Sequence, residues 1–173
     1  SQGTGPKTIR HQLESGVPVD IVIMSREGLD ELIAEDRILP GSDVELACVP
    51  LAVAVREGAA KPDIGTVAAF RRALLDARMV VMPGSTSGLF VKDEIFPRLG
   101  ITERVAFRVE PRGADSTGLL AAGGADLAIG PVSELVDQPG IETIGPIPDE
   151  LQLVQVFTAA IVNTSPRLEA AGK

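Results

Sequence analysis

Three hydroxyl side chains lie between two glycines in Gly84-Ser85-Thr86-Ser87-Gly88, where an apolar run ends and a helix-like segment begins. The first turn of a helix leaves four backbone N–H groups without an intrahelical acceptor and carries about half a positive charge. Such a turn binds an anion through N–H groups and hydroxyls, without Lys or Arg. The same residue types are also ordinary helix caps, so this loop alone leaves both interpretations open.

Two further segments share this composition. "SQGTGPKT" opens the chain and "PRGADST" spans 111–117, and each precedes a helix-like segment. A helix start contributes about 0.3 to 1 kcal/mol and a hydrogen bond to a charged group about 1.5 to 3 kcal/mol, whereas micromolar binding needs roughly 8 kcal/mol. We therefore expect an anion site only if several of these loops face one cleft.

Other chemistries lack the residues that they need. The loop at 84–88 is not followed by the Lys-Ser/Thr of a phosphate-binding loop, and Thr86 stands where a nucleophile elbow has Ser. With one cysteine, Cys48, and one histidine, His11, the chain offers no internal disulfide and no zinc-type cluster. We expect no metal, no cofactor and no catalytic residue, and a lone His11 on a polar helix face is usually just solvated.

The composition indicates a soluble, acidic protein with a packed core. Apolar residues make up 45% of 173 residues, which is enough for one domain or two small lobes. Acidic residues outnumber basic ones by 24 to 16, and Arg71-Arg72 is the largest basic cluster, so a nucleic-acid partner is not expected. No apolar stretch reaches about 18 residues, and no signal-peptide pattern opens the chain.

Segments rich in β-branched residues alternate with segments of helical period, which is typical of parallel α/β architecture. We predict strands at 19–25, 45–57, 78–83, 104–110, 125–130, 141–145 and 152–163. We predict helices at 6–15, 26–36, 66–77, 88–100 and 115–124, with Thr66 as the N-cap of the third. The strands at 45–57 and 152–163 are unusually long, and we interpret them as the places where the chain crosses from one lobe to another.

The order of these motifs resembles the extracellular solute-binding proteins of the molybdate-binding-like group, which are periplasmic components of ABC transporters. The resemblance is carried by "GPKTIRHQLESGVPVDIVIMS", "GSTSGLFVKDEIFPRLGI", "GGADLAIGPVSELVDQPGIETIGPIPDELQ" and "VFTAAIV". It implies the α/β fold of type 2 periplasmic binding proteins, with two lobes joined by two crossing strands. The first lobe would comprise 1–50 and 153–173, without the family's usual first strand and last helix, and the second lobe 51–152.

The resemblance also implies which residues contact a ligand in the cleft between the lobes. These are Gly3, Thr4 and Gly5 of the first loop, Ser85, Thr86, Ser87 and Gly88 of the second, and Gly113, Ala114 and Asp115 of a third helix start. The tyrosine that molybdate binders have after the strand matching "LAIG" is replaced by Pro131. We therefore expect a small organic carboxylate rather than molybdate, with Arg112 as either a further ligand contact or a solvated surface residue.

Two classes of function follow from the resemblance. The first is a periplasmic solute-binding protein, not an enzyme, whose partners are a small anionic solute and the membrane permease of an ABC transporter. The second is an isomerase of a small unsaturated carboxylic acid such as aconitate, with Glu110, Asp115 or His11 as the general base. A second copy of the chain is a further candidate partner, because an unpaired strand edge near "DIVIMS" would offer backbone groups to it.

Overall fold

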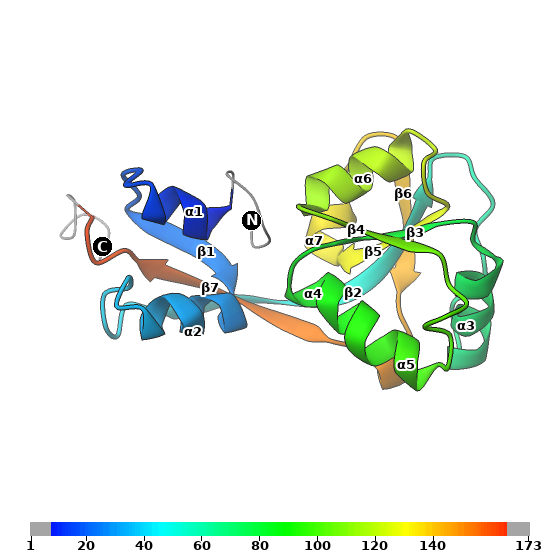
Figure 1. Ribbon diagram of the computed structural model, residues 1–173, viewed down its shortest axis with the longest axis horizontal. Helices are drawn as coiled ribbons and strands as arrows, with labels where there is room; N and C mark the ends of the chain where they lie inside the picture. The colour runs from blue at the N-terminus through cyan, green and yellow to red at the C-terminus, as the bar shows by residue number, and fades with distance from the viewer. Residues whose placement is uncertain (1–7, 166–173) are drawn as a thin grey trace. The chain divides into compact units, whose positions relative to one another are not determined.

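The computed structural model describes residues 8–165 of the chain, which divide into two compact units. Unit 1 combines the residues up to Cys48 with those from Gln155 onward, and unit 2 is the continuous segment Val49–Val154. Two strands, β2 (Val44–Arg56) and β7 (Val154–Ile161), continue from one unit into the other (Figure 1).

Unit 1 is a small α/β layer. Its helices are α1 (Ile9–Glu14) and α2 (Arg26–Ala34), and β1 (Ile21–Ser25) pairs antiparallel with β7, Ile21 opposite Ile161. The Thr8 hydroxyl accepts a hydrogen bond from the His11 N–H and so caps α1. Its core consists of one face of the strand pair and the inner faces of the helices: Leu13, Val22, Met24, Leu29, Leu32, Ile38, Ala160 and Val162.

Unit 2 contains a mixed sheet rather than a purely parallel one. Its remaining strands are β3 (Val80–Pro83), β4 (Phe107–Glu110), β5 (Leu127–Pro131) and β6 (Ile141–Pro146). The strands β3, β4 and β5 are parallel, in the order β5-β3-β4. The strand β2 runs antiparallel to both β5 and β6, so β6 has the same direction as β3, β4 and β5, and within unit 2 only β2 departs from the expected parallel arrangement.

Helices cover both faces of the unit 2 sheet. They are α3 (Val67–Asp76), α4 (Thr86–Phe90), the π-helical η1 (Val91–Ile95), α5 (Phe96–Arg98), α6 (Gly113–Ala121), α7 (Val132–Leu135) and the 3-10 turn η2 (Asp149–Leu151). The segments α4, η1 and α5 follow each other without a break. Pro97 has no N–H to donate to a preceding carbonyl, which fits the change of hydrogen-bond register in η1.

The alternation of side chains along β2 explains these two layers. Leu51, Val53 and Val55 point into a large cluster with residues of α3, η1 and α5, whereas Ala52 and Ala54 point into a second cluster with residues of α6 and α7. Successive residues of a strand face opposite sides, so one strand supplies both cores. The small alanines let the α6 side of the sheet be packed closely.

The predicted elements are found with modest shifts of their ends. All seven predicted strands and five predicted helices are present in the described residues, and α7 and η2 are additional elements. Thr66 caps α3 as expected, because its hydroxyl accepts a hydrogen bond from the Ala69 N–H at 3.1 Å. Among residues 8–165, no helix combines the length and the apolar character that crossing a membrane requires.

Candidate functional site

Three strand-to-helix turns lie at one edge of the unit 2 sheet. Because β3, β4 and β5 are parallel, their ends at Pro83, Glu110 and Pro131 lie at the same edge, which we call the carboxyl edge. The helices α4, α6 and α7 begin within three residues of these ends. In open α/β sheets the carboxyl ends of the strands are the usual place for a ligand. The two Gly- and hydroxyl-rich loops of unit 2 therefore lie at one edge.

The glycines of the first turn lie close to neighbouring backbone atoms. Gly84 donates its N–H to the Glu110 carbonyl at 2.6 Å, and a Cβ at position 84 would lie 3.2 Å from that oxygen. A Cβ at position 88 would overlap the Pro83 carbonyl oxygen and lie 2.9 Å from the carbonyl carbon. Gly88 thus has a structural role, whether or not it also contacts a ligand.

The three hydroxyls of this turn are not equivalent. Ser85 is the N-cap residue, its side chain makes no capping hydrogen bond, and its Oγ lies 3.1 Å from the Oγ of Ser87. Ser87 is fully buried, whereas Ser85 and Thr86 are partly exposed. Ser85 and Thr86 are therefore the hydroxyls of this turn that are accessible from solvent.

At the start of α6, the two charged side chains, Arg112 and Asp115, form an ion pair with each other. Arg112, the N-cap residue, donates to both carboxylate oxygens of Asp115, at 2.9 and 2.6 Å, and these hydrogen bonds raise the pKa of the guanidinium. Gly113 is buried and Ala114 is exposed. Arg112 already has a bidentate partner on its own helix, so a ligand carboxylate would have to compete with Asp115 for it.

Glu134 on α7 is a residue of this edge that the sequence analysis did not identify. A Cβ at position 113 would overlap the Glu134 Oε2 and lie 2.6 Å from its Cδ, so the carboxyl group rests directly on the first residue of α6. Its Oε2 is fully buried and has no hydrogen-bond partner. Burial raises the pKa of this carboxyl group, because a charged oxygen without a partner is poorly solvated there.

The other acids and the histidine considered as bases lie in different surroundings. Glu110 has an ion pair with Arg108 at 2.9 Å, and Asp115 is held by Arg112. His11 is exposed on α1 of unit 1. In the described part of the chain, no group of three or more His, Cys, Asp or Glu residues is placed to hold a metal ion.

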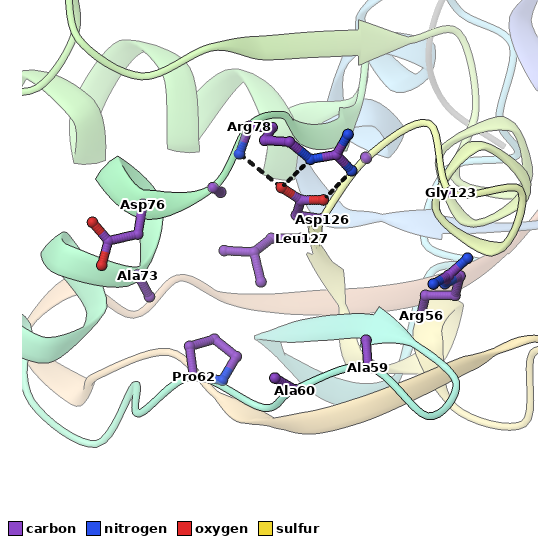
Figure 2. A pocket seen from close by; sticks show the side chains of 12 residues that line it. Arg56, Ala59, Ala60, Pro62, Ala73, Asp76, Arg78, Gly123, Asp126 and Leu127 are labelled. Atoms are coloured by element: carbon purple, nitrogen blue, oxygen red, sulfur yellow. Dashed lines mark hydrogen bonds and ion pairs between the residues drawn. The ribbon is translucent and has the colours of Figure 1, made fainter.

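A cavity of about 370 Å³ lies away from the carboxyl edge, near the residues that precede β3 and β5 (Figure 2). Its lining includes Arg56 at the end of β2, Asp76 of α3 and several alanines. Arg78 donates three hydrogen bonds to Asp126 there, at 2.7, 3.2 and 2.6 Å, which lowers the pKa of that carboxyl group. Its size suits a small molecule, but Arg78 and Asp126 in its lining are already hydrogen-bonded to each other. The carboxyl edge has a buried carboxyl oxygen without a hydrogen-bond partner, and we prefer this edge as the candidate site.

Some of the expected contacts remain predictions. Gly3, Thr4 and Gly5 lie outside the described residues, and nothing in unit 2 tests whether Ser85 to Gly88 or Gly113 to Asp115 contact a ligand. The sequence signal for Glu134 was weak. A Glu in the first turn of a helix is an ordinary feature, and only the fold places it on Gly113, 21 residues earlier.

Comparison with known proteins agrees with this fold. Residues 2–173 match the family described as bacterial extracellular solute-binding protein. An aconitate isomerase from a Pseudomonas species is 35% identical over 172 residues, which are 99% of this chain and 66% of the isomerase. The chain thus spans just under two thirds of the length of this relative.

Two solved structures show the same fold at low sequence identity. The periplasmic molybdate-binding protein of Azotobacter vinelandii is 19% identical with a TM-score of 0.70, covering 98% of this chain and 74% of that one. The binding protein AgtB of A. tumefaciens, solved in complex with agropinic acid, is 13% identical with a TM-score of 0.61, covering 100% and 65%. The expected fold of the periplasmic binding proteins is thereby confirmed.

Proposed function

The chain belongs to the bacterial extracellular solute-binding protein family, and from this premise we propose that it binds a small organic polycarboxylate at the carboxyl edge of unit 2. The observation that carries the proposal is the meeting of two helix starts there, at Thr86 and Gly113. Each start presents N–H groups without an intrahelical acceptor, and Ser85 and Thr86 add partly exposed hydroxyls.

The preference for a polycarboxylate has two supports. The 35% identical relative is named for aconitate, a tricarboxylate. Pro131, at the end of β5, has no N–H to add to a ring of donors around a tetrahedral oxyanion. In this proposal the protein acts in the periplasm and delivers its solute to the membrane permease of an ABC transporter. Pairing of a second copy with β1 stays a further prediction.

Isothermal titration of the full chain with aconitate, citrate and molybdate tests the proposal. Replacing Ser85 and Thr86 together by Ala should weaken polycarboxylate binding by about 1 to 3 kcal/mol, or roughly 5- to 150-fold, because two donors to a charged ligand are lost. Thr102→Ala removes an exposed hydroxyl in the turn after α5 and should leave the affinity unchanged. Submicromolar molybdate binding without detectable carboxylate binding would contradict the proposal.

A second candidate function is isomerisation of an unsaturated polycarboxylate, which the 35% identical aconitate isomerase favours. The reaction moves a proton from one carbon to another across an allylic system, so a base must take the proton and return it. Glu110 and Asp115 are held by arginines, which leaves Glu134 as the better base at this edge. Following trans-aconitate by its ultraviolet absorbance would detect turnover directly.

A further inference from the structure

Glu134 differs from the other acids of the carboxyl edge in having no partner for a buried oxygen. Its carboxyl group lies against Gly113, where any Cβ would overlap Oε2, and Oε2 accepts no hydrogen bond. A carboxylate that served only to cap α6 would accept N–H groups of the first turn with its buried oxygen. Glu134 is therefore positioned at a helix start without acting as a complete cap.

The charged side chains on the elements packed against α7 are not paired with Glu134. These elements are β5, β6 and α6. On α6, Asp115 is paired with Arg112, and on β6, Glu142 is paired with Lys61 at 2.5 Å. The strand β5 carries no ionisable side chain, and Asp137 follows α7 as an exposed residue. No cation among these groups is left to pair with Glu134.

We propose that Glu134 contacts the bound polycarboxylate as a neutral carboxylic acid, donating its proton in a hydrogen bond to one carboxylate of the ligand. This inference rests on the proposed function. When the free protein holds Glu134 ionised, binding takes one proton from the solution onto the Glu134 carboxyl group, and release of the ligand returns it. Solute binding at this edge is then coupled to pH.

The reason is that two carboxylates cannot both stay ionised at close range in a poorly solvated place. The ligand carries several negative charges that the protein does not remove, so the proton goes to the protein's own acid. Burial already raises the pKa of Glu134 in the free protein, which lowers the cost of adding this proton. The protonated carboxyl group has an O–H that it can donate to a ligand carboxylate, which an ionised Glu134 lacks.

The proton can be counted by isothermal titration of the full chain with aconitate between pH 6.5 and 9. Titrations in phosphate and in Tris, which differ in ionisation enthalpy, give the number of protons taken up. We expect this number to rise toward one with pH. The affinity should fall about tenfold per pH unit once Glu134 is ionised in the free protein.

Glu134→Gln keeps a hydrogen-bond donor but carries no titrating group. We expect it to bind aconitate with the affinity of the unmodified protein at low pH, independent of pH and with no proton taken up. Glu103→Gln removes the same charge from an exposed turn and should keep the full proton uptake. The measurements on the unmodified chain do not depend on how well either variant folds.

The outcomes separate this inference from the proposed function. Binding without proton uptake at any pH, or proton uptake that persists in Glu134→Gln, would overturn the role of Glu134 and leave polycarboxylate binding intact. An ionised Glu134 in the complex would also suit a base for isomerisation. Absence of binding by every polycarboxylate would contradict the proposed function and, with it, the inference.

Discussion

At the scale of single residues, Glu134 is expected to make the stability of the protein depend on pH. Its raised pKa means that the folded chain holds this proton more tightly than the unfolded chain. The stability it contributes is complete below the ordinary pKa of a glutamate and is lost as pH rises through the raised value. Glu134→Gln should therefore raise the unfolding midpoint at pH 7 to 8.

Thermal unfolding followed by circular dichroism checks this prediction. The difference between Glu134→Gln and the unmodified chain should shrink to nothing below about pH 4, where the carboxyl group is neutral in both states. Glu103→Gln serves as the control for general charge effects. A lower midpoint for Glu134→Gln at pH 7 would show instead that the ionised carboxylate stabilises the start of α6.

At the scale of elements, the junction of β3 and α4 depends on Gly88. A Cβ there would overlap the Pro83 carbonyl oxygen. This oxygen belongs to the backbone, so it cannot rotate away from the added Cβ as a side-chain atom could. Gly88→Ala should lower the free energy of unfolding by about 1 to 3 kcal/mol, as overpacking does. Urea denaturation of the variant measures this loss.

Gly118 offers a matched control for that experiment. It is an exposed glycine inside α6, and a Cβ there would meet nothing within 4 Å. Gly118→Ala should raise the free energy of unfolding by about 0.5 to 1 kcal/mol, because alanine favours the helix. Equal effects of the two variants would mean that the backbone at Gly88 yields easily.

The same junctions show what the sequence could predict. The Gly-Ser-Thr-Ser-Gly turn was found from local residue types, because caps and strand ends are local features. The distinction between a reachable Ser85 and a buried Ser87 needed the packing of the whole helix. Glu134 and Gly113 are separated along the chain, so neither revealed the other until β4 and β5 were placed in one sheet. The mixed direction of that sheet is likewise a nonlocal property.

At the scale of the whole molecule, the two units differ in the size of their cores. In the described part of the chain, unit 1 has one small cluster of buried apolar side chains, whereas unit 2 has two, one of them much larger. Hydrophobic burial supplies most of the stability of a domain, so unit 1 is expected to open more readily.

Native-state hydrogen exchange in low concentrations of denaturant tests this order. Amides of β3 should exchange only through global unfolding. Amides of β1 and β7 should exchange through an opening of unit 1 that has a lower free energy. Equal protection of β1 and β3 at every denaturant concentration would mean that the chain unfolds as one cooperative body.

The pairing of β1 with β7 also means that β1 cannot complete its fold until most of the chain has been synthesised. Ile21 lies opposite Ile161, so the ribosome must add 140 residues after Ile21 before the partner of Ile21 is complete. At about 5 to 20 residues per second, a ribosome needs about 7 to 28 s for this distance. All of unit 2 is synthesised within that interval and can fold. During this time β1 has no β7 to pair with, and its apolar side chains stay exposed to solvent. The nascent chain therefore passes through a stage at which a chaperone would recognise β1.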